Sequence, residues 1–244
     1  LPTRRQRQMC IRDSVNTMAY VATTIVDGHE ILENELWASA DSPFLVTGDI
    51  RISEYASLTI EPGSRVLFVP SYDGNPISDN YQSSPDLVEI EVAGEFVSEG
   101  SIELPIVFEA IGQRENQADW GGFLLHDTSQ SNFTFTHIKN TSIGIYYSVY
   151  RSGISWEFTN SELSYSRNGV SIEAYCDCEI AIKNSQFDHI ENAAFSISAY
   201  DSNVTYENNV VSNSGNASIS AAKHLAFTDN ILAVSYTHLT LPTS

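Results

Sequence analysis

The chain has 244 residues, of which 42% are hydrophobic, and it carries a formal net charge of −19. This length and composition are sufficient for a substantial hydrophobic core. The acidity disfavours binding to nucleic acid or to anionic membranes, because phosphate groups would be repelled. No segment reaches the roughly 18 apolar residues that a membrane-spanning helix needs. We therefore expect no nucleic-acid partner and no membrane span in this sequence.

The two ends of the chain differ from the rest. Residues 4–14 (RRQRQMCIRDS) and residues 234–243 (VSYTHLTLPT) can be encoded by DNA strands that are reverse complements of each other. Such a pair is typical of translated sequencing-adapter DNA, so residues 1–14 and 234–244 are predicted to be non-native tails. The alternative for the first tail is a basic arm that binds nucleic acid. Without the tails, eight basic and 30 acidic residues remain, a net charge of −22. The native ends and any signal peptide are expected to be missing.

The N-terminal part of the chain consists of short strand-like runs. Residues 15–44 are expected to cap the N-terminal end of the fold, because the edge strands at an open end need cover. Four runs broken by glycine or proline follow, at residues 45–52, 57–68, 87–97 and 105–110. Residues 70–86 are rich in Ser, Asp, Asn and Pro and are expected to form an exposed loop.

A repeat of 21 to 25 residues follows, and apolar positions define it. The first column is Phe135, Phe158, Ile182, Tyr206 and Phe227. Another large apolar residue stands two positions before each member, which is typical of a strand with one buried face. The second column pairs a small residue with an apolar one: Gly122-Phe123, Gly144-Ile145, Gly169-Val170, Ala194-Phe195 and Ser218-Ile219. A third apolar position recurs between them, at Leu163, Phe187 and Val211.

Two or three short strands per repeat fit a coil that rises about 4.8 Å per turn, the separation of neighbouring strands. Propeller blades need about 40 residues or more, and the consensus of leucine-rich repeats is absent. The sequence therefore predicts an all-β fold, a right-handed single-stranded parallel β-helix over residues 45–233 that continues beyond this sequence.

Polar residues also recur in register. Two positions after the first column come His137, Asn160, Asn184, Asn208 and Asp229. A second set, Asn168, Asn192 and Asn216, stands just before the second column. Asparagine tolerates a left-handed backbone and bonds to nearby backbone groups. These columns therefore predict corners of the coil.

Four motifs carry a family resemblance: TGDI (47–50), LTIEPGSRVLF (58–68), PIVFEA (105–110) and WGGF (120–123). They resemble the N-terminal portion of bacterial right-handed parallel β-helix repeat proteins, which have the pectate-lyase-like superfamily fold. The resemblance covers residues 37–232 and implies an exported protein, extracellular or at the cell surface. That family includes adhesins, exported proteins of unknown role and relatives of polysaccharide lyases and hydrolases, so the resemblance implies the fold rather than one function.

No catalytic residue can be assigned from the sequence. Lyases and hydrolases with this fold need a base beside carboxylates, and their characteristic strings NTD, GHG and RIK are absent. Arg151 and Arg167 are candidates only if their turns bring them together. The histidines His126, His137 and His189 have no spacing that gathers them into one site.

Metal sites are also unsupported. Cys176 and Cys178 have no second ligand pair for zinc, so we expect two free cysteines packed on one strand face, with a disulfide as the alternative. In the run from Val88 to Val92, Glu89 and Glu91 are expected to form a solvated outer face. Calcium is the alternative there, although no D-x-D-x-D-G loop is present. No cofactor is therefore expected.

Tyr150, Tyr175 and Tyr200 recur at intervals of 25 residues. If the turns stack, these rings form a ladder along the coil. Tyrosine offers an apolar ring and a hydroxyl, which suit contact with sugars in water. The three tyrosines are thus the candidate binding residues for a polysaccharide or cell-surface glycan. The alternative is a tyrosine stack that only closes a corner of the coil.

The sequence thus predicts a non-catalytic exported or cell-surface β-solenoid, adhesin-like or carbohydrate-contacting. The alternative is a polysaccharide lyase or glycoside hydrolase of the β-helix type, with its active site partly beyond residue 233. A third hypothesis is a purely structural repeat.

Overall fold

The computed structural model describes residues 24–70, 87–111 and 118–234. The predicted tails, apart from Val234, and nearly all of the predicted loop lie outside the described residues. The described chain is all-β, with parallel strand pairing throughout its sheets, and forms a solenoid of about eight turns. It contains one 3-10 turn, η1 (Ser39–Asp41). The predicted fold class is confirmed.

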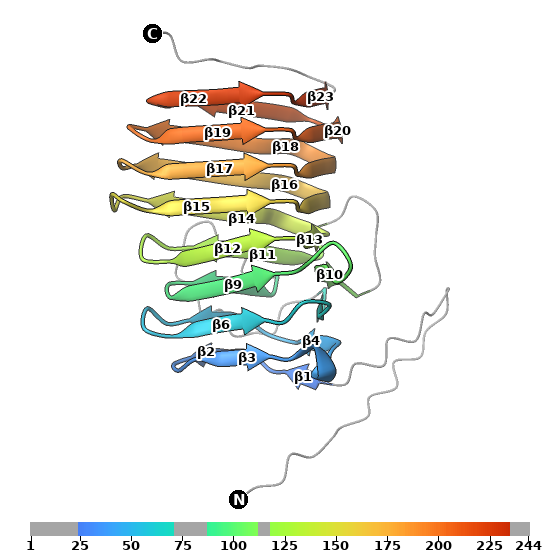
Figure 1. The fold of residues 1–244 in the computed structure, drawn as a ribbon. Coiled ribbons are helices and arrows are strands. Elements are labelled where there is room, and N and C mark those ends of the chain that lie inside the picture. Colours follow the sequence, from blue (N-terminus) through green and yellow to red (C-terminus); the bar gives the residue numbers. More distant parts are fainter. Residues whose placement is uncertain (1–23, 71–86, 112–117, 235–244) are drawn as a thin grey trace, which may run out of the picture.

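One face of the solenoid is a sheet of eight parallel strands, which we call the front sheet because it is nearest the viewer in Figure 1. Each turn contributes one strand. These are β3 (Glu35–Trp37), β6 (Ser57–Ile60), β9 (Glu95–Glu99), β12 (Gln130–Thr134), β15 (Ser155–Thr159), β17 (Glu179–Lys183), β19 (Asn203–Glu207) and β22 (His224–Thr228).

The other strands form a sheet that bends into two faces. The second face contains β1 (Thr24–Val26), β4 (Phe44–Val46), β7 (Arg65–Phe68), β10 (Ile106–Ala110), β13 (Thr136–Lys139), β20 (Val210–Ser214) and β23 (Ile231–Val234). The third face contains β2 (His29–Ile31), β5 (Ile50–Ile52), β8 (Glu89–Val92), β11 (Trp120–Leu125), β14 (Thr141–Val149) and β21 (Asn216–Ser220). The long strands β16 (Glu162–Tyr175) and β18 (Gln186–Tyr200) pass along both faces.

The coil is right-handed. In Figure 1 the strands of the front sheet run from left to right while the chain rises from β3 to β22, and the returning strands lie behind them. Strands β1, β2 and β3 pair in parallel with β4, β5 and β6. Residues 24–37 are therefore themselves a turn of the solenoid, and they cover the N-terminal end of its core.

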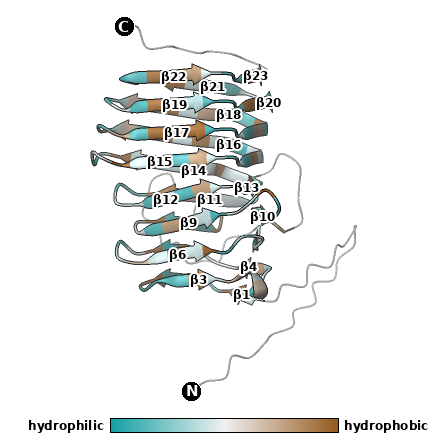
Figure 2. Cartoon of the chain, in the orientation of Figure 1, coloured by the Kyte–Doolittle hydropathy of each residue, from teal (hydrophilic) through white to brown (hydrophobic). Residues whose placement is uncertain are grey.

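The core is built from side chains that face inward and stack along the coil axis. Trp156, Ile180 and Val204 lie in successive turns, and the strand register pairs them directly. Around the middle of the coil, rings from Phe96, Phe108, Phe123 and Phe133 pack with centroids 5.1 to 6.1 Å apart. Figure 2 shows hydrophilic and hydrophobic residues mixed along the strands, as expected when alternate residues face the core.

The first predicted column is confirmed in part. Phe158, Ile182, Tyr206 and Phe227 are paired through the register. Phe135 was assigned wrongly, because Phe133 is the residue that pairs with Phe158. Both phenylalanines fit a period of two, so the pattern alone permits either register. The chain instead turns at Phe135, which has a φ of 47°.

The predicted corner of asparagines is confirmed in the later turns. Asn160, Asn184, Asn208 and Asp229 have φ values of 52°, 52°, 53° and 54°, in the left-handed region. The prediction was wrong for His137, because it lies inside β13 and Phe135 takes the corner of that turn. The register error in the first column displaced this assignment by two residues.

The second predicted column also needs one correction. Phe123, Ile145, Val170 and Phe195 pair in successive turns, as predicted. In the next turn Ala217 pairs with Phe195, whereas Ile219 pairs with Ile197. A register irregularity between Ala193 and Phe195 shifts the alignment there. The third column of Leu163, Phe187 and Val211 is confirmed.

Candidate functional site

The three candidate tyrosines form a continuous ladder. The ring of Tyr175 stacks between those of Tyr150 and Tyr200, with centroids 5.1 Å apart on each side and interplanar angles of 8° and 7°. The residues are 60%, 46% and 50% exposed from Tyr150 to Tyr200. The predicted stacking is therefore present. Its role in binding stays a prediction.

Stacking limits the way in which this ladder can contact a ligand. Each internal ring face lies against its neighbour, so a ligand can reach mainly the ring edges and the hydroxyl groups. Only the outer faces of Tyr150 and Tyr200 are not covered by another ladder ring. The ladder is therefore a rim of ring edges and hydroxyls rather than a flat platform for successive sugars.

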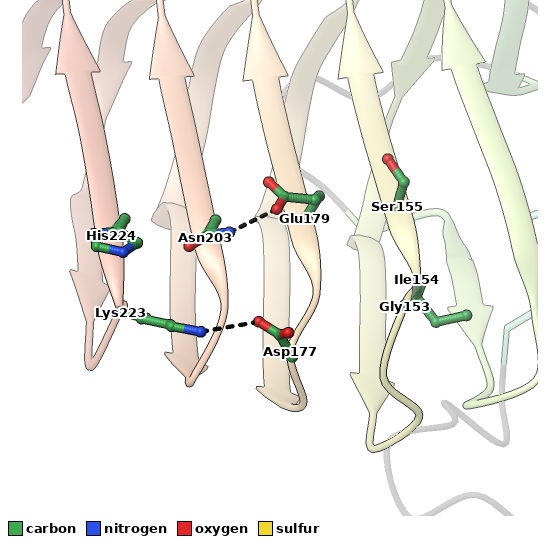
Figure 3. A pocket seen from close by; sticks show the side chains of 8 residues that line it. All are labelled: Gly153, Ile154, Ser155, Asp177, Glu179, Asn203, Lys223 and His224. Atoms are coloured by element: carbon green, nitrogen blue, oxygen red, sulfur yellow. Dashed lines mark hydrogen bonds and ion pairs between the residues drawn. The ribbon is translucent and has the colours of Figure 1, made fainter.

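A groove lies on the other side of the same turns. Figure 3 shows this groove crossing the starts of β15, β17, β19 and β22. Short turns connect the tyrosine ladder to the first three of these strands. The depression drawn in Figure 3 has a volume of about 450 Å³ and is lined by Gly153, Ile154, Ser155, Asp177, Glu179, Asn203, Lys223 and His224.

A second depression of about 310 Å³ shares Gly153, Ile154 and Ser155 with the first. It extends across β9 and β12, where Glu95, Gln130 and Asn132 contribute to its wall. We call the two depressions together the polar groove. Because neighbouring strands are about 4.8 Å apart, a groove from β9 to β22 is about 24 Å long.

One row of side chains follows the groove. The register pairs Ser155 with Glu179, Glu179 with Asn203, and Asn203 with His224. The sequence analysis missed these residues although a signal exists: each directly precedes an inward residue, namely Trp156, Ile180, Val204 and Leu225. In a strand, the neighbour of an inward residue faces outward.

Two charged groups of the polar groove form an ion pair, and a third is held by an amide. Nζ of Lys223 lies 3.2 Å from Oδ1 of Asp177, and Nδ2 of Asn203 donates to Oε1 of Glu179 at 2.6 Å (Figure 3). Glu95 adds a further exposed carboxylate. With one lysine against three carboxylates, the groove is negative overall.

Cys176 and Cys178 form a disulfide in the turn between β16 and β17, beside the groove. The prediction of two free cysteines was wrong, and the alternative of a disulfide is what the structure contains. Both residues face the interior and are only 3% and 2% exposed, and their Cα atoms are 5.3 Å apart. Because both side chains point to the same side of the chain, their sulfur atoms are close enough to bond. The same placement lets the disulfide pack against the core.

Replacing both Cys176 and Cys178 by alanine should lower the free energy of unfolding by about 1 to 2 kcal/mol, because a disulfide that closes so short a loop restricts the unfolded chain only slightly. Denaturant unfolding of the wild type, with and without reductant, and of the double variant measures this difference. Peptide mapping after alkylation of denatured, unreduced protein provides the control. Labelling of both cysteines there would contradict the disulfide.

The predicted solvated acidic face was also wrong. Glu89 and Glu91 face away from the core, but they are only 3% and 4% exposed. Oε1 of Glu91 contacts Nε2 of His126, and its Oε2 lies 3.9 Å from Nη1 of Arg51. A buried carboxylate needs such partners to offset the loss of hydration. The alternation of polar and apolar residues predicts which face of the strand a side chain lies on. It does not predict whether other side chains cover that face.

The other candidate charged residues are dispersed. Nδ1 of His137 lies 4.0 Å from Oε2 of Glu162, and Nδ1 of His189 lies 2.7 Å from Oδ2 of Asp188. His126 contacts Glu91, so each of the three histidines has a different acidic partner. Arg167 is 4.0 Å from Glu191 within the long strands, whereas Arg151 lies in the turn before β15. The two arginines therefore lie at different corners. Within residues 24–70, 87–111 and 118–234, no group of three acidic, histidine or cysteine side chains is placed to hold a metal ion.

Asp188 is a hydrogen-bonded carboxylate at the corner where β18 bends. Its Oδ1 accepts from Oγ of Ser212 at 2.6 Å and from Nδ2 of Asn213 at 2.9 Å, and its Oδ2 lies 2.7 Å from Nδ1 of His189. Burial alone would raise the pKa of Asp188. The three partners outweigh burial and hold this pKa below its ordinary value.

Asp188→Asn should reduce stability near neutral pH and have less effect in acid. A carboxyl with a lower pKa in the folded chain stabilises the fold fully above its unfolded pKa, near 3.8, and loses that contribution as the pH falls through the folded value. Urea unfolding of wild type and variant across this range measures the difference. A difference that keeps its neutral-pH size as the pH falls well below 3.8 would contradict the assignment.

The part of the chain that the structure describes contains no helix of the length and apolar character needed to cross a bilayer. Comparison of the chain with protein-family models, with curated proteins and with solved structures found no match. The fold and the geometry of the polar groove and tyrosine ladder are therefore the basis on which a function is proposed.

Proposed function

We propose that this chain is a non-catalytic β-solenoid that contacts glycans outside the cell or at its surface, and that its polar groove binds an extended neutral polysaccharide. The observation that carries this proposal is the row of Ser155, Glu179, Asn203 and His224 along the groove, with one hydrogen-bonding side chain in each turn.

The spacing of this row supports a polymeric ligand. Successive side chains are separated by one strand spacing, about 4.8 Å, which is comparable to the length of one sugar ring along an extended chain. A polysaccharide can therefore present a similar hydroxyl group to each turn. A small isolated ligand would use only one or two of these positions.

The charge of the groove favours a neutral ligand. Asp177 and Glu179 line its wall together with Glu95, and the cation of Lys223 is already held by Asp177. An acidic polysaccharide would place its carboxylates beside these groups, and like charges at close range repel each other. Neutral hydroxyl groups can both donate to the carboxylates and accept from the amide of Asn203.

The disulfide supports a location outside the reducing cytosol. Disulfides persist mainly in oxidising environments, such as the periplasm and the cell exterior. The Cys176–Cys178 bond lies in a turn of the groove wall. Export is therefore consistent with the covalent structure of the site.

We expect the tyrosine ladder to add contacts to the glycan bound in the groove. It borders the same turns as the groove, and its exposed edges extend the surface that a broad glycan can touch. Tyr175→Ala should weaken glycan binding by removing the central ring, whereas Tyr175→Phe should retain the stack and lose only one hydroxyl. Equal binding by wild type and Tyr175→Ala would remove the ladder from the proposed site.

Affinity electrophoresis in gels that contain neutral or acidic polysaccharides tests the groove directly. Neutral polymers should retard the wild type, and Asn203→Ala should reduce the retardation, because one hydrogen bond of the row is lost. Ser171→Ala, which removes a polar side-chain group from the third face, is the control and should behave as the wild type.

Three results would contradict the proposal. One is the absence of retardation by every neutral polymer. Another is equal loss of binding in Asn203→Ala and the Ser171→Ala control. The third is release of unsaturated or reducing-end products, with or without calcium, because this would support the alternative of a polysaccharide lyase or hydrolase.

A further inference from the structure

The tyrosine ladder holds three phenol rings side by side on the exposed surface of the coil. Tyr175 is aligned with Tyr200 in the register of β16 and β18, and Tyr150 directly follows Val149, which is aligned with Ala174. The three tyrosines therefore lie in consecutive turns, about 4.8 Å apart along the coil. Because the hydrogen-bonded backbone fixes this spacing, neighbouring rings stay close to each other.

The backbone of the ladder is held at both ends, whereas its side chains are exposed. The N–H of Tyr150 donates to Oδ1 of Asp127 at 2.5 Å, and Tyr200 forms an antiparallel bridge with Ala222. The three side chains are 46% to 60% exposed. An exposed ring can turn about its Cα–Cβ and Cβ–Cγ bonds between rotamers. The ladder thus combines a fixed backbone with rings that can tilt toward one another.

Neighbouring phenol rings at this separation are suited to oxidative coupling. The ring centroids of each pair are 5.1 Å apart. A phenol that loses one electron and its hydroxyl proton becomes a phenoxyl radical, which shares its unpaired electron with the ring carbons ortho to the oxygen. Two such radicals in contact form a carbon–carbon bond between ortho carbons. Holding both rings in one chain makes this coupling step effectively unimolecular.

From this geometry we infer that the tyrosine ladder is an oxidative cross-linking site, at which Tyr175 forms dityrosine with Tyr150 or Tyr200. The oxidant is hydrogen peroxide used by a peroxidase. The two phenols give up two electrons and two protons, which reduce one peroxide to two water molecules. After coupling, the hydrogen on each joined carbon moves to the oxygen of its ring, and both rings become aromatic again. The new bond ties two consecutive turns together beside the Cys176–Cys178 disulfide.

Other tyrosines of the described chain lack this arrangement. Tyr55 is 89% exposed and lies at the same corner of the coil, between β5 and β6. The turns on either side of it, residues 32–34 and 93–94, contain no tyrosine. Tyr165 stacks on a histidine. Three tyrosines are at most 3% exposed, which shields them from an oxidant in solution: Tyr146, Tyr147 and Tyr206.

Oxidation of the full chain with a peroxidase and hydrogen peroxide tests the site. Trypsin cleaves after Arg151, Arg167 and Lys183, so the three ladder tyrosines fall in three different peptides. We expect a cross-linked peptide pair that contains Tyr175 and has lost two hydrogen atoms. The dityrosine fluorescence of the chain monomer should not depend on protein concentration, because both rings belong to one chain. Free tyrosine in a parallel reaction is the control for oxidant activity.

Tyrosine-to-phenylalanine variants distinguish the ladder from general exposure. Tyr175→Phe keeps a ring in the stack but removes the phenol shared by both pairs, so the yield of monomeric dityrosine should fall at least about tenfold. Tyr150→Phe should retain a large part of the yield, because the pair of Tyr175 and Tyr200 remains. Tyr55→Phe is the matched control, with the same substitution at the same corner, and should keep the wild-type yield.

Three results would overturn the cross-linking site. One is the absence of any cross-linked peptide that contains Tyr175 in the oxidised wild type. Another is a monomeric yield in Tyr175→Phe equal to that of the wild type. The third is dityrosine found only in covalent dimers of the chain. Cross-linking needs no bound glycan, so a chain that forms this bond but binds no neutral polysaccharide would support the site and contradict only the proposed function.

Discussion

Phe123→Ala should lower the free energy of unfolding by about 3 to 5 kcal/mol, the cost of removing a large ring from a packed core. Phe123 is fully buried, and its ring lies 5.1 Å from those of Phe96 and Phe133 and 5.6 Å from that of Trp120. These rings come from successive turns and from two sheets. The cavity would therefore weaken several interfaces between turns at once.

Equilibrium unfolding in guanidinium chloride, followed by tryptophan fluorescence and by circular dichroism, measures this loss. Leu36→Ala is the control, because Leu36 is 57% exposed and its loss should change stability by less than about 0.5 kcal/mol. Similar losses in the two variants would contradict the placement of Phe123 at the centre of the core.

Gly122→Ala should destabilise the chain by more than about 4 kcal/mol or prevent folding, because its side chain would collide with fixed backbone. Gly122 has a φ of 110°, and a Cβ at this position would lie 1.6 Å from the carbonyl oxygen of Ile143. Neighbouring turns approach so closely there that no rotamer change can relieve the contact. The strand pairing between β11 and β14 would have to open.

Gly153→Ala separates this collision from backbone strain. Gly153 also has a positive φ, of 81°, but a Cβ there would meet nothing within 4 Å. It should therefore cost only about 1 kcal/mol, the strain of a left-handed conformation in a residue with a Cβ. Thermal and denaturant unfolding of both variants gives the comparison. A Gly122→Ala variant as stable as Gly153→Ala would contradict the close approach of the turns.

Much of the solenoid could be predicted from the sequence because its physical cause is local and repeated. Each turn must bury the same inward positions, so Phe158, Ile182 and Tyr206 recur at nearly constant intervals. The corner residues Asn160 and Asn184 recur for a similar reason, since the chain needs a positive φ at the same place in each turn. A single apolar or asparagine position predicts little, but the same position repeated in several turns predicts the solenoid.

The errors of register have an equally physical origin. Phe133 and Phe135 are both apolar and two residues apart, so moving between them leaves the alternation of faces unchanged. The structure selects Phe133 because the chain turns at Phe135. Likewise, the register irregularity between Ala193 and Phe195 changes the alignment of the next turn, but the hydrophobic pattern of the sequence does not reveal it.

The candidate site was only partly accessible from the sequence. The stacking of Tyr150, Tyr175 and Tyr200 followed from their equal spacing, but the mutual covering of their faces required the ring planes. The polar groove depends on outward residues of different chemical types, so no repeated residue identifies it. The burial of Glu91 depends on contacts between turns, which alternation within one strand does not encode.

Hydrogen exchange, followed by mass spectrometry with and without a bound neutral polysaccharide, tests the central claim most directly. The account predicts slower exchange in peptides that cover the starts of β12, β15, β17, β19 and β22, where the polar groove lies. Peptides from the third-face part of β16 and β18 before the tyrosine ladder should be unchanged. Protection confined to the second or third face, with none along the groove, would contradict the account.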